Sequence, residues 1–241
     1  MNATPNSTIR DIVAADFRAA AIFHGYGIDF CCGGGKTLAQ ACHERSVCAG
    51  EVLRDVARAC RLADDSTPRF AEWDTDTLIA YIVSTHHGYV RRAMPVIAAY
   101  TAKLASVHGG NHPELLDVKR VFDGVVAEMT AHMAKEETVL FPYIAELADA
   151  AQAGEPIRRP PFGHVDNPIR MMEAEHEKTG EAMAVIKALT DEYRAPADAC
   201  PTYRICLQEL DAFEQDLHRH VHLENNVLFP RARFLANLQT C

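Results

Sequence analysis

Apolar residues recur along most of the chain at the three- and four-residue spacing of an α-helix. Residues 9–24 show this spacing first, and the shorter stretches 38–45 and 51–62 repeat it. Sustained alternation of apolar and polar positions between turn residues, which would indicate strands, does not occur in the sequence. The pattern therefore predicts an all-α protein.

The later helices are predicted to be long, over roughly 75–105, 113–149, 168–193 and 202–236. Asp74 or Thr75 is suited to cap the first of them, and Pro113 to begin the second. A connection rich in glycine and proline, residues 151–167, separates the two helix pairs. Two helices, a long crossover and two more helices make a common four-helix bundle.

A polar, proline-containing stretch, residues 63–69, indicates a linker. We place a domain boundary near residue 68. The prediction is a small helical amino-terminal domain over residues 1–68, followed by a helical bundle domain over residues 69–241.

Composition narrows the classes of partner. The 241 residues carry a formal net charge of -9 with no basic stretch, which argues against nucleic acid as a partner. No run of about 18 apolar residues indicates a membrane span. Charged residues within the first 25 positions argue against a secretory signal. We therefore expect a cytoplasmic protein whose eight cysteines stay reduced.

One short pattern occurs twice, 88 residues apart. His132 and Glu136 are followed by Val-Leu-Phe-Pro at 139–142, and His220 and Glu224 by the same four residues at 227–230. A further histidine precedes each copy at a similar distance, His87 by 45 residues and His176 by 44. This duplication of a helix pair predicts two related half-sites.

Residues four apart lie on one face of a helix, so each copy can present an imidazole and a carboxylate to one ion. Four histidines and two glutamates suit two metal ions, with the glutamates bridging ions about 3.5–4 Å apart. Mixed nitrogen and oxygen ligands suit iron, manganese or zinc, and we favour iron. A single copy would more often be a surface pair; it is the repetition that favours a metal centre.

Several neighbouring residues are open to two interpretations. His86 adjoins His87, but adjacent helical positions point about 100° apart, so we expect only one to face the core. His218 and His222 should either be solvated or lie behind the ligands without binding metal themselves. His108, His112 and His164 fall in predicted loops. Glu128 and Asp216 each precede a ligand histidine by four residues and are either orienting or ordinary surface acids.

Cys31 and Cys32 are followed by three glycines and Lys36. Closely approaching backbone amides and a nearby lysine would lower the pKa of a thiol, which favours a reactive or metal-capturing pair. The alternative is two small buried apolar side chains before a turn. The residues themselves do not decide between these.

The run from Asp29 through Cys31-Cys32 and Gly33-Gly34-Gly35 to Leu38 resembles the amino-terminal signature of the di-iron proteins that repair iron–sulfur clusters. Residues 173–177, 132–142 and 220–231 resemble the hemerythrin-like bundle of the same family. The resemblance implies a non-haem centre of two iron ions held by six residues: His87, His132, Glu136, His176, His220 and Glu224. It prefers His87 to His86 because the family ligand lies eight residues before a proline, here Pro95. It also places His108 near the metal pocket.

The resemblance further implies that the chain repairs damaged iron–sulfur clusters under nitrosative or oxidative stress, by supplying iron. An alternative is a di-iron protein that binds nitric oxide to scavenge or sense it. Oxidase or peroxidase chemistry ranks last because the sequence indicates no substrate pocket. We thus favour a metal-binding repair or nitric-oxide-binding protein over a turnover enzyme, with Cys31 and Cys32 as candidate reactive thiols. Expected partners are damaged iron–sulfur proteins, nitric oxide and a second copy of the chain.

Overall fold

A computed structural model describes residues 3–61, 68–157 and 160–238. The chain divides into two compact units. The amino-terminal unit comprises Met1–Leu78 together with His218–Cys241, and the bundle unit comprises Ile79–Leu217. The linker predicted at 63–69 falls largely outside the described residues, and the predicted boundary near residue 68 stays a prediction.

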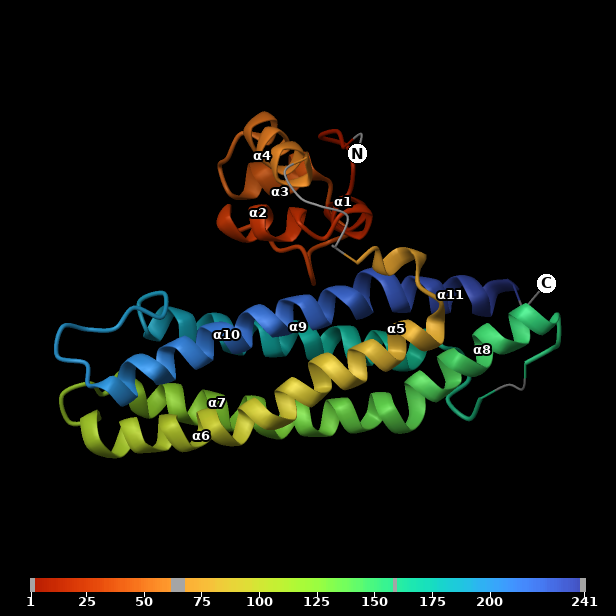
Figure 1. Ribbon diagram of the computed structural model, residues 1–241. Coiled ribbons are helices and arrows are strands. Elements are labelled where there is room, and N and C mark those ends of the chain that lie inside the picture. The colour runs from red at the N-terminus through yellow and green to blue at the C-terminus, as the bar shows by residue number, and fades with distance from the viewer. Residues whose placement is uncertain (1–2, 62–67, 158–159, 239–241) are drawn as a thin grey trace. The chain divides into compact units, whose positions relative to one another are not determined.

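The amino-terminal unit begins with four helices: α1 (Ile9–Ala15), α2 (Ala19–Gly25), α3 (Leu38–Glu44) and α4 (Ala49–Arg61) (Figure 1). The prediction of one helix over residues 9–24 was wrong. Asp16 adopts an extended backbone with φ of -156° and ends α1, and its carboxylate accepts hydrogen bonds from the backbone and side chain of Arg18. This local side-chain bonding competes with the helix and separates α1 from α2.

The chain's last segment belongs to the same unit. It comprises the end of α10 (Pro201–Leu223), the π-helical turn η4 (Glu224–Leu228) and α11 (Phe229–Leu238). Val221 is buried in one apolar cluster with residues of α1 to α4, including Ile9, Phe23 and Leu38. Arg231 donates hydrogen bonds to the carbonyl of Ala71, within the short helix η1 (Phe70–Glu72), and to that of Trp73, which follows it. The two ends of the chain therefore share one core.

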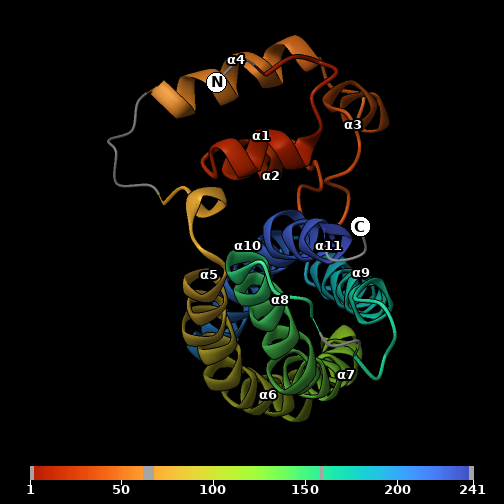
Figure 2. The ribbon, with the colours of Figure 1, turned by 90° about the vertical axis from the view of Figure 1, so that its right-hand side faces the viewer.

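The four long helices that the sequence predicted are present, and most of their length belongs to the bundle unit. α5 (Thr75–Tyr81) continues through the π-helical turn η2 (Ile82–His87) into α6 (Gly88–His108). α7 (Glu114–Lys135) continues through a second π-helical turn, η3 (Glu136–Leu140), into α8 (Phe141–Ala153). α9 (Asp166–Leu189) and α10 complete the four (Figure 2). Asp74 is the cap of α5, since its carboxylate accepts a hydrogen bond from the Thr77 amide.

Within the described residues the structure contains no strand; Thr8 and Thr37 form a single antiparallel bridge. The all-α prediction is confirmed. Pro142 and Pro230 each lie in the first turn of a helix, α8 and α11, directly after a π-helical turn, and the helix continues beyond them. A proline lacks the N–H that would bond one turn back and collides with that turn, so a widened turn before it accommodates the ring.

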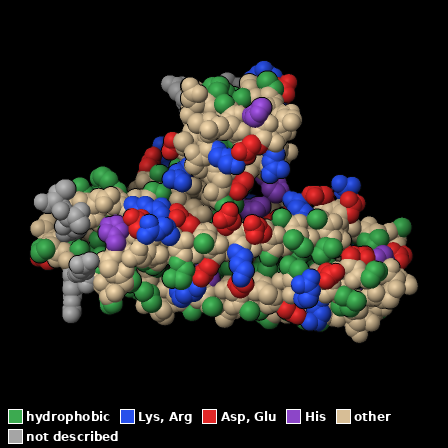
Figure 3. All heavy atoms as spheres, turned by 180° about the vertical axis from the view of Figure 1, so that it is seen from behind, with side chains coloured by type: hydrophobic (Ala, Val, Ile, Leu, Met, Phe, Trp, Pro, Cys, Tyr) green, Lys and Arg blue, Asp and Glu red, His purple; other side chains and the backbone are tan. Residues whose placement is uncertain are grey.

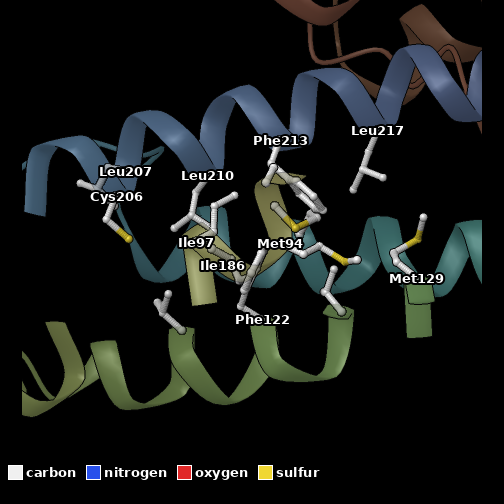
Figure 4. Packing of buried hydrophobic residues seen from close by; sticks show 14 of the residues in the cluster. Met94, Ile97, Phe122, Met129, Ile186, Cys206, Leu207, Leu210, Phe213 and Leu217 are labelled. Atoms are coloured by element: carbon white, nitrogen blue, oxygen red, sulfur yellow. The ribbon is translucent and has the colours of Figure 1, made fainter. Parts of the chain in front are cut away.

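The core of the bundle unit is built from apolar side chains of α6, α7, α9 and α10, which meet along the bundle axis (Figure 4). Phe122 of α7 and Phe213 of α10 are both fully buried, with ring centroids 5.5 Å apart in an edge-to-face arrangement. Ile97 of α6 and Ile186 of α9 are buried in the same cluster. This packing fixes the four helices that present the polar residues described below.

On the face drawn in Figure 3, acidic and basic side chains are interspersed. Among the residues described, no helix combines the length and the apolar run that crossing a bilayer would need.

We predict that Phe122→Ala lowers the free energy of unfolding by about 3–5 kcal/mol, since it leaves a cavity beside Phe213. Denaturant unfolding followed by circular dichroism measures the change. Leu116→Ala on the same helix is the matched control, because Leu116 is 54% exposed and its loss should cost less than about 0.5 kcal/mol. Equal losses in the two variants would contradict the position of Phe122 in the core.

Candidate metal centre

Glu136 lies at the centre of a buried polar cluster in the bundle unit. Its side chain is fully buried, and its Oε2 atom lies 3.2 Å from Nε2 of His132 and 3.4 Å from Nε2 of His87. His132 and Glu136 are one helical turn apart, as the His-x-x-x-Glu spacing required. His87 comes from η2 on a different helix, so the carboxylate joins two elements of the bundle.

His176 of α9 joins the same cluster. Its Nε2 atom lies 3.0 Å from Nε2 of His132, so the Nε2 atoms of both imidazoles face the same small region of the interior. His132, Glu136 and His176 each offer one ligand atom, and these atoms lie within 4.8 Å of one another. The structure therefore brings together the four candidate ligands that fall in the bundle unit, from three different helices.

Two further carboxylates hold the far side of the imidazoles. Nδ1 of His132 lies 2.9 Å from a carboxylate oxygen of Glu175, and Nδ1 of His87 lies 2.5 Å from one of Glu137. An imidazole that donates its Nδ1–H presents the lone pair of Nε2, which is the form that binds a metal ion. The outer carboxylates thereby orient both Nε2 atoms toward the cluster.

Each outer carboxylate also contacts a cation near the surface. Lys135 bonds to Glu175, and Arg91 lies 2.7 Å from Glu137. Burial alone would raise the pKa of Glu137, but the hydrogen bonds from His87 and Arg91 outweigh it and hold that pKa below its ordinary value. Glu175 shows the same balance. Burial raises its pKa, but the hydrogen bonds from Lys135 and His132 have the larger effect, and the pKa is lower than its ordinary value. Both carboxylates are thus ionised acceptors.

The sequence did not identify Glu137 and Glu175. Both directly adjoin a candidate ligand, Glu136 and His176, and that adjacency was the available signal. The acids it did consider are placed differently. Glu128 bonds to Lys178 on the surface, and Asp216 lies 2.9 Å from Nδ1 of His86.

His86 and His87 are both buried, contrary to the expectation that only one would face the interior. They lie in the π-helical turn η2, whose wider register places two consecutive side chains inward. His87 contacts Glu136, whereas His86 contacts Asp216 and packs against the ring of Tyr81 at 5.6 Å. The two histidines therefore have separate partners.

Each of the three π-helical turns found among the described residues contains a candidate ligand: His87 in η2, Glu136 in η3 and Glu224 in η4. Such turns are rare and occur most often at functional sites, where the altered register aims a side chain. Their coincidence with candidate ligands indicates that the backbone is locally adjusted to aim these side chains.

His220 and Glu224 lie in the amino-terminal unit, one turn apart on α10 and η4. His220 Nε2 is 2.8 Å from a carboxylate oxygen of Glu224, and both side chains are fully buried. His222 is buried too, which excludes the solvated position that was one of the two expected for it. Burial lowers its pKa to about 4, so the ring is neutral, and its Nδ1 lies 3.1 Å from the Asn226 amide nitrogen.

The cysteine pair lies in a tight loop of the amino-terminal unit. The Sγ atoms of Cys31 and Cys32 are 3.8 Å apart, and Cys31 Sγ lies 3.2 Å from Oδ1 of Asp29. Asp29 also accepts hydrogen bonds from the backbone amides of Cys31, Cys32 and Gly33. Cys31 is buried, whereas Cys32 is exposed to solvent.

The lowered thiol pKa, which belonged to one of the two interpretations that the sequence left open, does not occur at Cys31. The glycine-loop amides bond to the Asp29 carboxylate, and Lys36 pairs with Glu44 at 2.7 Å. The hydrogen bond with Cys32, then burial and the negative charge of Asp29, all raise the pKa of Cys31 well above its ordinary value. Cys31 is therefore a neutral thiol in this arrangement.

Asn226 anchors the cysteine loop to η4. Its amide nitrogen donates to the carbonyls of Phe30 and Cys31 at 3.1 and 3.2 Å, and its Oδ1 accepts from Arg10 at 2.9 Å. Gly34 packs directly on this contact, because a Cβ atom there would lie 2.7 Å from Oδ1 of Asn226. The glycine run thus permits a close approach of backbone and side chain.

His108 does not lie near the cluster, contrary to what the family resemblance implied. It ends α6, whereas His87 directly precedes that helix, and 21 residues of helix span about 30 Å. His108 instead contacts Cys200 at 3.3 Å and packs against Tyr203. It belongs to the opposite end of the bundle.

The donor set of the bundle cluster fits a metal ion. A carboxylate that is wholly removed from water requires positive charge or donors around it. Imidazole nitrogen and carboxylate oxygen together suit iron, manganese or zinc. The outer carboxylates supply the second layer that orients such ligands. These residues could therefore hold a cation through their Nε2 and carboxylate oxygen atoms.

Comparisons with known proteins agree with this chemistry. Residues 78–232 match the family model described as the hemerythrin HHE cation binding domain, and residues 5–59 match ScdA_N, a domain of unknown function. The chain is 33% identical to the iron–sulfur cluster repair protein ScdA of Staphylococcus haemolyticus, over 94% of this chain and 97% of that protein. It is 31% identical to the iron–sulfur cluster repair protein YtfE of Yersinia pseudotuberculosis, over 94% and 96% respectively.

We predict that Glu175→Gln weakens ferrous iron binding by about tenfold or more, because a neutral amide holds the His132 imidazole less firmly and makes it less basic. Competition with a ferrous chelator without oxygen measures the affinity. Glu128→Gln is the control, since Glu128 also bonds across α7 and α9 but contacts Lys178 on the surface. Unchanged iron binding in Glu175→Gln would show that the outer carboxylate does not support the ligand.

We predict that Gly34→Ala lowers the free energy of unfolding by about 1–3 kcal/mol, since its methyl group would displace the anchored Asn226 side chain. Thermal and denaturant unfolding measure the loss. Gly25→Ala in the same unit is the matched control: nothing lies within 4 Å of a Cβ placed there. If Gly34→Ala were as stable as the control variant, the close packing of the loop on Asn226 would be refuted.

Proposed function

The chain belongs to the hemerythrin HHE cation-binding family and, over nearly its whole length, to the iron–sulfur cluster repair proteins, and from this premise we propose that it repairs damaged iron–sulfur clusters by supplying iron. The observation that carries the proposal is the wholly buried Glu136 carboxylate. Imidazoles of His87 and His132 approach it, and each is held from behind by its own carboxylate.

We further propose that the centre holds two iron ions. Its ligands would be His87, His132, Glu136 and His176 of the bundle unit with His220 and Glu224 of the amino-terminal unit. Support comes from the repeated His-x-x-x-Glu pattern and from the span of the matching cation-binding domain, residues 78–232, which includes all six residues. Iron bound there would supply a redox-active cation with exchangeable ligands.

The residues of the chain suit the release of that iron. Imidazole and carboxylate ligands can be protonated, unlike a closed cage of thiolates, so they exchange metal more readily. Glu137 and Glu175 are partly exposed, with side chains 25% and 30% accessible, and each also contacts a cation. A proton arriving from solvent at either carboxylate would loosen its hold on the imidazole Nδ1 atom. The proposed recipient is an iron–sulfur protein with a damaged cluster, in keeping with the names of the relatives.

The test uses the full chain loaded with ferrous iron without oxygen, mixed with a dehydratase whose four-iron cluster nitric oxide has damaged. We expect dehydratase activity to return. A His132→Ala/His220→Ala variant should restore no more activity than the same concentration of free iron. His164→Ala is the matched control, because His164 is a partly exposed histidine in the connection before α9 that we place outside the centre.

Metal analysis and Mössbauer spectra of the same samples report the iron content directly. If the double variant restored as much dehydratase activity as the unaltered chain, the repair proposal would be refuted. Should the loaded protein instead remove nitric oxide and leave the dehydratase inactive, the nitric-oxide-binding alternative would replace it.

A further inference from the structure

The cysteine loop is a second cluster of potential ligands. Asp29, Cys31 and Cys32 each offer one ligand atom, and these three atoms lie within 4.8 Å of one another. All three residues belong to the amino-terminal unit. Because two of its three donors are sulfur atoms, this cluster differs chemically from the histidine and glutamate centre.

The charges around the pair oppose a nucleophilic role. A reactive thiolate is normally stabilised by a nearby cation. Here a carboxylate oxygen lies 3.2 Å from Cys31 Sγ, while Lys36 pairs with Glu44 and Arg10 donates to Asn226. A second negative charge on sulfur at that distance from Asp29 would be unfavourable. A cation placed between them would reverse the effect and favour both anions.

The geometry of the sulfur atoms suits one ion. Two thiolates bound to a single tetrahedral ion at about 2.3 Å each must lie about 3.8 Å from one another. The Sγ atoms of Cys31 and Cys32 are 3.8 Å apart. That separation exceeds a disulfide bond of about 2.05 Å by far. The pair is thus already at the spacing that shared coordination requires.

The loop holds these donors in place before any ion arrives. Three backbone amides bond to the Asp29 carboxylate and fix its direction. Asn226 holds the carbonyls of Phe30 and Cys31. Because the loop is ordered on folding, binding an ion would lose little additional conformational entropy.

We propose that Asp29, Cys31 and Cys32 form a second metal site, for a thiophilic ion of the zinc type, with one side open to solvent. Thiolate ligands select soft and borderline ions over magnesium or calcium. Binding of one divalent ion releases the two thiol protons to solvent and forms two metal–sulfur bonds and one metal–oxygen bond. The exposed Cys32 leaves the fourth position accessible to water or to a ligand from another molecule.

The experiment titrates the reduced full chain with Co²⁺, a spectroscopic substitute for Zn²⁺. Thiolate ligation gives cobalt an intense near-ultraviolet charge-transfer band, which histidine and carboxylate ligation do not give. We expect this band to saturate at one thiolate-bound ion per chain and to disappear when Zn²⁺ displaces cobalt. Magnesium should leave it unchanged.

Variants assign the band. Cys31→Ser and Cys32→Ser should abolish it, and Asp29→Asn should weaken cobalt binding at this site by about tenfold or more. Cys48→Ser is the matched control, because Cys48 is another exposed thiol of the same unit, outside the cluster. It should keep the full band and affinity.

The proposal is overturned if the wild-type chain takes up cobalt without a thiolate band, or if the band survives in the Cys31→Ser/Cys32→Ser variant. Circular dichroism and the cobalt held by the bundle centre check that each variant is folded. Should Cys31→Ser unfold because its side chain is buried, Cys32→Ser decides the question, since that side chain is exposed. The result does not depend on whether the bundle iron repairs clusters.

Discussion

The bundle is organised around the cost of placing a carboxylate in its interior. Glu136 is fully buried, and a charge removed from water is tolerated only where cations or hydrogen-bond donors replace the water. Imidazole Nε2 atoms from two helices approach it within 3.4 Å. The helices must therefore meet at this level, and the apolar core around Phe122 and Phe213 keeps them there. The polar cluster around Glu136 and the apolar core around Phe122 therefore require the same alignment of the bundle helices.

The polar cluster continues outward to solvent in two parallel chains of contacts. One runs from His132 through Glu175 to Lys135, and the other from His87 through Glu137 to Arg91. Each carboxylate is held ionised by contacts on both sides. The arrangement fixes which nitrogen of each imidazole faces inward, and it also gives protons from solvent a way to influence the hold on a metal ion.

In the amino-terminal unit a carboxylate is stabilised in a different way. Its carboxylate, Asp29, is satisfied by backbone amides of a glycine-rich loop, and Asn226 ties that loop to η4, two residues after Glu224. The thiols then face a negative charge instead of a positive one. For this cysteine pair the sequence left a reactive, a metal-capturing and a purely structural role open, and the nearby negative charge is the observation behind the cation site proposed above.

Helical periodicity determined the all-α fold and the four long helices, because the apolar stripe of each helix is encoded locally. The repeated His-x-x-x-Glu pattern likewise indicated candidate ligands, since side chains four residues apart share a face. Local pattern failed where a single side chain altered the backbone, as at Asp16. The family resemblance, in turn, misplaced His108, which lies about 30 Å along α6 from His87.

Only the tertiary structure decided the partners that the ligands have. Glu175 reaches His132 across 43 residues of sequence, Glu137 reaches His87 across 50, and Asn226 reaches the carbonyl of Cys31 across 195. No local spacing encodes such pairs, because they depend on how separate helices pack against one another. Whether a thiol meets a lysine or a carboxylate is decided in the same way, by the fold of the loop that surrounds it.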